Sequence, residues 1–354
     1  MKNGNTTAKM IVEVRNAIRS IHIEDKIIVA VSSGCDSMVL LHLLAIKCKR
    51  KHIAVAHINH NIHEEESRKD EQFVRDFCKS HNIDYHSENI FPNEDKLDGE
   101  SIEMTWRRLR YQALEKIAKR EGCKHLATAH NANDQVETIL YKMCRSSNVG
   151  GIAGMNAIVH TGKLFHIRPL LNIERKDIEE YARFNKVPYR NDSDNTNLAH
   201  QRNFIRHKII PLLLEVNPQA IRHICDISDG FKSVEEAAEK EAERRLGEVV
   251  GGIYHCGRYL GSYLCLELMD SPAFGEDMKA RILFHWLQKN FMKMDVASIT
   301  KVELDKIFAK PKGNIKKTIR IGGIWFTIYK GNLFEETIAQ SHRFIGKLQF
   351  YEFT

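Results

Sequence analysis

The sequence predicts an α/β protein, with a doubly wound parallel sheet in the first part of the chain and a C-terminal α+β domain after it. Short β-branched runs alternate with longer helical stretches up to about residue 145, which is typical of a parallel sheet covered by helices on both faces. From about residue 174 the pattern becomes mainly helical. A paired-strand pattern then surrounds Gly322 and Gly323 near the end of the chain.

Hydrophobic periodicity assigns the individual elements. The candidate strands of the first part cover residues 26–31, 52–58 and 124–129. The candidate helices there cover residues 36–47, 67–80, 101–121, 133–144, 174–185 and 200–214. The second part is predicted to contain helices at 221–246 and 278–289 and two strands within 315–329. Pro211 and Pro218 bracket the join, so we expect one domain over residues 1–217 and another over 218–354, with the ligand at the carboxyl ends of the parallel strands.

Composition and charge narrow the class of protein. With 43% hydrophobic and 28% charged residues, the 354-residue chain lies in the range of folded globular proteins. It contains neither an apolar run of membrane-spanning length nor the apolar core of a signal peptide, so we expect a cytoplasmic protein with no membrane partner. The 8 cysteines form no CxxC pair, which disfavours a zinc or iron–sulfur site. The net charge is +7, and residues 301–330 alone carry +6, which is compatible with a polyanionic partner.

Small polar residues follow the first predicted strand and lead into a helix. They read Ser32, Ser33, Gly34, Cys35, Asp36 and Ser37. A loop between a strand and a helix N-terminus can bind an anion through backbone N–H groups and the helix dipole. No GK[ST] follows, so this is not a Walker phosphate loop. An ordinary strand-to-helix turn, with Ser32 or Asp36 as the helix cap, is the alternative.

Two further segments offer polar groups. His57 and His60 stand at the end of the second predicted strand, where they either face a ligand or are simply hydrogen-bonded; no third ligand is evident, which disfavours a metal site. The helix predicted over 101–121 carries Arg107, Arg110 and Tyr111 on one face. Guanidinium groups suit phosphates because they stay charged and can bind bidentately, although a solvated basic helix shows the same pattern.

Charged pairs recur later in the chain at helical spacing. Asp134 and Glu137 share one face of the first turn of a predicted helix, where acids also favour the helix dipole. Arg202 and Arg206 are four apart on one helical face, with Asn203 beside Arg202, and this spacing suits phosphate groups.

In this order, the segments resemble the N-type ATP pyrophosphatases and, among them, the tRNA(Ile)-lysidine synthetases. The first loop resembles the family's SGGxDS, with Ser33 in place of a glycine. Residues 103–111 (EMTWRRLRY) resemble ARxxRY, with Trp106 in place of an alanine, and residues 128–138 nearly match HxxDxxET. The string IRPLL at 167–171, followed by RNFIR at 202–206 and Pro211, is typical of the lysidine synthetases. The resemblance covers residues 26–218 strongly and the basic tail only weakly.

The resemblance implies a Rossmann-like PP-loop ATPase that uses ATP and Mg²⁺ to join free L-lysine to C2 of the wobble cytidine of tRNA(Ile) with a CAU anticodon. It implies ATP binding by Ser32, Ser33, Gly34, Cys35, Asp36, Ser37, His57, Arg107 and Arg110, with Asp36 near the Mg²⁺. It implies that Asp134 and Glu137 hold the lysine or the metal and act with Asp36 in catalysis. We expect contacts to tRNA or other phosphates from Arg202, Asn203, Arg206, Lys316 and Lys317.

Two other functions stay open at this point. A tRNA thiolase on the same fold would need a persulfide-carrying cysteine, and Cys35 and Cys144 lie near the expected site. A non-catalytic tRNA-binding protein would explain Ser33 as the trace of a lost ATP site, and it predicts salt-dependent RNA binding without ATP turnover. The sequence leaves the general base and the oligomeric state open, a homodimer included.

Overall fold

The chain divides into two compact units, Met1–Phe231 and Lys232–Thr354. The computed structural model describes residues 2–22, 24–47, 52–60, 64–145, 152–161, 164–190, 201–255, 258–266, 268–272, 274–291, 301–309, 317–321, 324–329, 332–335 and 349–352. The division lies inside helix α9 (Ala220–Val249), later in the chain than the boundary that Pro211 and Pro218 led us to expect at residue 217.

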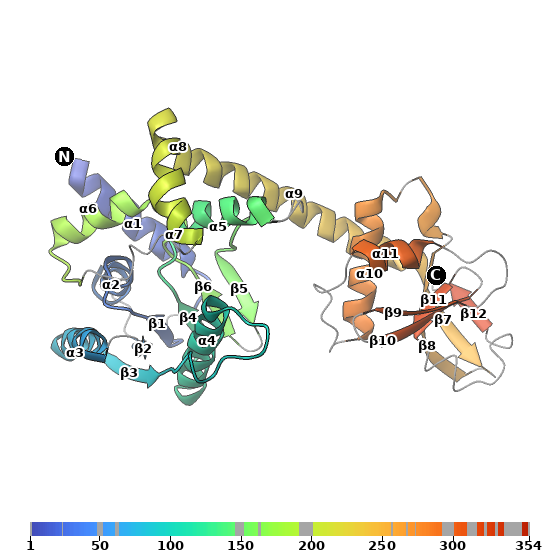
Figure 1. The fold of residues 1–354 in the computed structure, drawn as a ribbon, viewed down its shortest axis with the longest axis horizontal. Coiled ribbons are helices and arrows are strands. Elements are labelled where there is room, and N and C mark those ends of the chain that lie inside the picture. The colour runs from blue at the N-terminus through green and yellow to red at the C-terminus, as the bar shows by residue number, and fades with distance from the viewer. Residues whose placement is uncertain are drawn as a thin grey trace. The chain divides into compact units, whose positions relative to one another are not determined.

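The first unit is built on a sheet with the strand order β3-β2-β1-β4-β6-β5 (Figure 1). Its strands are β1 (Ile27–Ala30), β2 (Ile53–Asn59), β3 (Asp84–Asn89), β4 (His125–Ala127), β5 (Ile158–Thr161) and β6 (Leu164–Ile167). All neighbours pair in parallel except β5, which runs antiparallel to β6 at the edge. The predicted parallel-dominated sheet is therefore confirmed, and it gains one antiparallel strand.

Helices cover both faces of this sheet. The helices of the first unit before α9 are α1 (Lys2–Ala17), α2 (Cys35–His42), α3 (Glu64–Ser80), α4 (Ile102–Arg120), α5 (Ala132–Arg145), α6 (Arg175–Asn185), α7 (Gln201–Phe204) and α8 (Ile210–Val216), with π-helical turns at Leu43–Lys47 and Ile205–Ile209. Ile27 and Val29 of β1 pack in one core with α1, α2, α3 and α6, whereas Ile28 packs in a second core with α4. Successive side chains of a strand point to opposite faces, so a continuous apolar run is what a doubly covered sheet requires.

The second unit contains an antiparallel sheet with the strand order β12-β7-β8-β11-β10-β9. Its strands are β7 (Val250–His255), β8 (Arg258–Cys265), β9 (Lys317–Ile321), β10 (Ile324–Tyr329), β11 (Asn332–Glu335) and β12 (Gln349–Glu352), and its helices after α9 are α10 (Glu276–Asn290) and α11 (Lys301–Phe308), with a 3₁₀ turn at Leu268–Asp270. Trp286 of α10 and Phe326 of β10 lie in its core. The predicted pair of strands on either side of Gly322 and Gly323 is confirmed, while these two glycines lie outside the described residues. No helix among the described residues has the length and apolarity needed to cross a membrane.

Candidate active site

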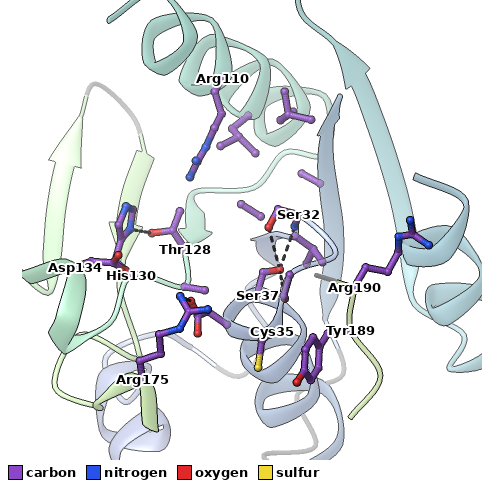
Figure 2. Close-up of a pocket in the computed structure, with 18 of the residues that line it drawn as sticks. Ser32, Cys35, Ser37, Arg110, Thr128, His130, Asp134, Arg175, Tyr189 and Arg190 are labelled. Carbon is purple, nitrogen blue, oxygen red and sulfur yellow. Dashed lines mark hydrogen bonds and ion pairs between the residues drawn. The ribbon is translucent and has the colours of Figure 1, made fainter. Parts of the chain in front are cut away.

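A cavity of about 570 Å³ opens at the carboxyl ends of β1, β2 and β4 (Figure 2). Its walls come from the loop after β1, from the start of α2, from the residues that follow β4 and from α4, α5 and α6. The described residues with side chains or backbone at its surface include Ser32, Gly34, Cys35, Asp36, Ser37, His60, Arg110, Thr128, His130, Asp134, Arg175, Glu179, Tyr189, Arg190 and Arg206. A volume of this size suits a ligand as large as a nucleotide.

The loop after β1 is folded on itself by short hydrogen bonds. The Ser37 hydroxyl accepts from the Ser32 N–H at 3.1 Å and donates to the Gly34 carbonyl at 3.0 Å. Ser33 has a φ of +68°, in the left-handed region that favours glycine, and its carbonyl accepts from the Arg190 N–H at 3.0 Å. Gly34 is the N-cap residue of α2 and no side chain caps this helix, so its first N–H groups are available for an anion.

Asp36 occupies the first turn of α2 with one carboxylate oxygen bonded and the other not. Oδ2 lies 3.4 Å from Nη1 of Arg175, whereas Oδ1 is buried and has no hydrogen-bond partner among the described residues. Burial raises the pKa of Asp36 to about 6, and the Arg175 charge opposes this rise. A cavity-lining carboxylate with one unpartnered oxygen fits Mg²⁺, which proteins often hold through one or two carboxylates together with substrate phosphates.

The two acids of α5 hold a guanidinium between them. Nε of Arg206 lies 2.5 Å from Oε1 of Glu137, and Nη2 of Arg206 lies 3.0 Å from Oδ1 of Asp134. The second oxygen of Asp134 accepts the Asn131 N–H at 3.0 Å, which fixes the carboxylate at the helix start. Burial raises the pKa of Glu137. Sequence reasoning assigned Arg206 to phosphates, whereas in the structure its single positive charge pairs with both of these acids.

The histidines take different positions from those expected. His57, expected at the nucleotide, is buried with Nδ1 2.8 Å from the Val31 carbonyl oxygen, and it is not among the described residues that line the cavity. His60 lines the cavity instead. Burial lowers the pKa of His60 to about 4, and burial together with nearby arginines lowers the pKa of His130 to about 3. Both imidazoles are therefore neutral at pH 7, and they can donate and accept hydrogen bonds.

The expected arginines surround the cavity without all lining it. Arg110 points from α4 toward His130 across the cavity (Figure 2), while Arg107 is exposed. Both guanidinium groups lie over the ring of Tyr111, with their central carbons 5.0 Å (Arg107) and 5.8 Å (Arg110) from the ring centre. Arg202 is exposed on α7 and its guanidinium lies 5.9 Å from the ring centre of Tyr141.

The remaining expected residues lie in three places. Cys35 lines the cavity, and burial raises the pKa of its thiol to about 12, so it is protonated at pH 7. Asn203 follows Arg202 on α7. Lys317 begins β9 in the second unit and donates to the carbonyls of Lys306 and Ala309, whereas Lys316 lies outside the described residues.

The sequence reasoning missed several cavity residues, among them Arg175, Glu179, Tyr189 and Arg190. Arg175 opens α6, where the pattern predicted a helix but gave no reason to assign its first residue a site role. The backbone of Arg190 contacts the loop after β1, and its Nε lies 2.5 Å from Oδ1 of Asp70 on α3. Such contacts join residues more than a hundred positions apart in the chain, and local spacing carries no signal for them.

Comparisons with known proteins agree with the resemblance drawn from the motifs. Residues 6–213 match the model of the PP-loop domain family. The chain is similar to the tRNA(Ile)-lysidine synthase of Thermotoga maritima, at 39% identity over 200 residues that make up 55% of this chain and 46% of that protein. It is also similar to the tRNA(Ile)-lysidine synthase of Lactiplantibacillus plantarum, at 34% identity over 64% of this chain and 50% of that protein. The chain thus spans about half the length of these curated relatives. Among solved structures, the U34-tRNA thiolase NcsA from Methanococcus maripaludis shares the fold, with a TM-score of 0.54, 18% identity and coverage of 66% of this chain and 80% of that chain.

Proposed function

This chain belongs to the PP-loop domain family, and we propose that it uses ATP to join free L-lysine to C2 of the wobble cytidine of tRNA(Ile) with a CAU anticodon. The products are lysidine, AMP and pyrophosphate. The observation that carries the proposal is one cavity lined by an anion-binding loop, by Asp36 with its unpartnered oxygen, and by Asp134 of α5, which shares the Arg206 guanidinium with the buried Glu137 behind it. Curated relatives at 34–42% identity that carry the lysidine synthase name support the same substrate.

The reaction needs activation because the C2 oxygen of cytosine is a poor leaving group. In the first substitution this oxygen attacks the α-phosphorus of ATP, the bond to the β-phosphate breaks, and pyrophosphate leaves. The loop from Ser32 to Ser37 supports this step, since the uncapped start of α2 offers N–H groups to phosphate oxygens. When bound through Asp36 and the phosphates, Mg²⁺ would neutralise the charge that develops there.

In the second substitution a neutral amine of lysine attacks C2 and AMP leaves with the former C2 oxygen, while the amine loses a proton. Asp134 and Glu137 support the binding of this substrate, because a carboxylate pair that holds the Arg206 guanidinium also suits an ammonium group. Arg206 in turn offers a guanidinium to the carboxylate of a free amino acid. Positioning of the amine is the main requirement of the step, and His60 and His130 contribute as neutral hydrogen-bonding groups.

The two alternatives differ from this proposal in their products. A thiolase would transfer sulfur to tRNA, and the curated names do not favour it; the thiolase NcsA shares the fold with this chain at only 18% identity. A non-catalytic RNA-binding protein would bind tRNA without consuming ATP.

The adenylated intermediate gives a direct test of the first step. ATP labelled at the α-phosphate is incubated with an unmodified tRNA(Ile) transcript and no lysine, and the RNA is then isolated. We expect label on this RNA, release of labelled AMP on addition of lysine, and neither result with Asp36→Asn. Label that never reaches the RNA, under conditions in which the RNA binds, would refute adenylation of the cytidine.

A further inference from the structure

A pair of arginines on one tyrosine ring lies beside the cavity and is not explained by ATP or lysine binding. The guanidinium carbons of Arg145 and Arg202 lie 5.2 and 5.9 Å from the ring centre of Tyr141. Arg145 also donates a hydrogen bond from Nη1 to the Tyr141 hydroxyl. Neither arginine is among the described residues that line the cavity, and both are exposed.

Tyr141, which contacts both arginines, lies one helical turn from Glu137 of the proposed lysine site. Tyr141 follows Glu137 by four residues on α5, and Arg202 precedes Arg206 by four residues, so α5 faces the segment 201–209 through two successive contacts. The inner contact joins Glu137 to Arg206, and the outer contact joins Tyr141 to Arg202. The outer contact is the more exposed of the two.

These arginines differ from Arg75 and Arg245, which also lie over aromatic rings. Arg75 lies 5.2 Å from the ring centre of Tyr85, but its guanidinium also forms a 2.6 Å ion pair with Glu71. Arg245 lies over Phe274 and pairs with Glu241 at 2.6 Å. Within the described part of the chain, no carboxylate forms an ion pair with Arg145 or Arg202.

Positive charge is concentrated around this pair. Arg110, Arg168, Arg107 and Arg202 all contribute, after burial, to the lowered pKa of His130. Arg202 likewise adds to the effect of burial in lowering the pKa of Lys142, the residue next to Tyr141. The Arg202 charge also opposes the rise that burial causes in the pKa of Glu137, so this acid offsets part of the positive charge. An anion bound between Arg145 and Arg202 would offset more of it.

We propose that Arg145 and Arg202, held on Tyr141, form a receptor for a backbone phosphate of the RNA substrate, distinct from the site of the ATP phosphates. This inference rests on the proposed function for the identity of the RNA. The guanidinium groups lie over the ring and offer several N–H donors in a planar arrangement to phosphate oxygens, which a lysine ammonium does not. One phosphate held here would orient the nucleotide that enters the cavity.

The test compares binding of a tRNA(Ile) transcript to the wild type, Arg145→Gln, Arg202→Gln and the double variant over a series of salt concentrations. We expect each single variant to weaken RNA binding roughly tenfold at low salt. The double variant should lower the slope of log affinity against log salt by about 0.7–0.9, the value for one phosphate contact. Arg75→Gln is the matched control, because it removes an exposed, ring-stacked arginine that is already paired with an acid; it should leave affinity and slope unchanged.

ATP affinity, measured separately on the same proteins, distinguishes the two sources of phosphate. It should stay within about twofold of the wild type in both single variants. The receptor is refuted if the variants keep the RNA affinity and salt slope of the wild type, or if they lose ATP affinity instead. It is also refuted if the wild type does not bind the transcript at low salt. None of these readings uses lysine transfer, so a protein that shows the expected slopes but attaches no lysine would refute the proposed function and leave the receptor standing.

Discussion

Replacement of Asp36 by asparagine is expected to stabilise the folded protein while abolishing ATP turnover. The carboxyl group is mostly buried, its Oδ1 has no hydrogen-bond partner among the described residues, and its attraction to Arg175 does not compensate for burial. An asparagine keeps the shape of the side chain and removes the buried charge. The same change removes the carboxylate proposed to hold Mg²⁺, so stability and activity should move in opposite directions.

The size of the effect follows from the pKa of Asp36. A rise from 3.8 to about 6 corresponds to about 3 kcal/mol of free energy against the ionised form. Because the folded pKa lies above the unfolded one, the favourable contribution of this carboxyl is fully present below about pH 3.8 and is lost as the pH rises through about 6. The stability difference between Asp36→Asn and the wild type should therefore grow from about 1.6 kcal/mol near pH 5 to about 3 kcal/mol near pH 7.5.

Urea unfolding followed by circular dichroism at these two pH values measures the difference. Asp177→Asn serves as a control: burial also raises the pKa of Asp177, but this residue is not among the described residues that line the cavity, so its replacement should leave ATP turnover unchanged. If Asp36→Asn is less stable than the wild type near pH 7.5, or if the difference does not change with pH, the burial argument for Asp36 is wrong.

Three further predictions concern the structure around the site. Ser33→Gly should raise the free energy of unfolding by about 0.5–1 kcal/mol, because glycine adopts the left-handed backbone without strain and loses only part of this gain to unfolded-chain entropy. Lys186→Gly, at a φ of +53° at the end of α6, should give a similar gain, and a loss of stability in Ser33→Gly alone would contradict this reasoning. Gly154→Ala should lower the free energy of unfolding by about 1–3 kcal/mol, because the new Cβ would lie 2.6 Å from a side-chain amide nitrogen of α5. Gly122→Ala has a similar φ but open space around the new Cβ, so it should cost only about 1 kcal/mol. Equal losses of the two variants in urea unfolding would refute the steric argument. Arg206→Gln should lower the free energy of unfolding by about 2–3 kcal/mol and raise the KM for lysine, because it leaves two carboxylates without the cation that pairs with them. If the Arg206→Gln variant is as stable as the wild type, the pairing is unimportant.

The sequence predicted most of the first unit because its helices and central strands carry strong periodic patterns. The helix expected over 101–121 is observed at Ile102–Arg120, and the one expected over 133–144 at Ala132–Arg145. Some missed elements lack such patterns, although helix α1, with Met10 and Val14 four apart in the core, was missed despite one. Strand β3 reads DYHSEN, a polar segment with exposed or half-exposed side chains at the sheet edge, and only its pairing with β2 makes it a strand.

The site was predictable where one short segment carries the chemistry. The loop from Ser32 to Ser37 and the acids of α5 were identified from local order, and the structure brings Ser32, Asp36 and Asp134 to one cavity. The partners of these residues were not predictable, because Arg175 and Arg206 reach them through tertiary packing across 139 and 69 positions of the chain. His57 and His60 show the same limit, since the sequence places both at a strand end and only the fold decides which one faces the cavity.

The most direct measurement is incorporation of radiolabelled lysine into an unmodified tRNA(Ile) transcript with a CAU anticodon, with and without ATP, using tRNA(Met) as the control RNA. The account predicts ATP-dependent labelling of tRNA(Ile) alone, lost in Asp36→Asn and retained in Asp177→Asn. Absence of labelling under conditions in which tRNA(Ile) and ATP both bind would contradict it.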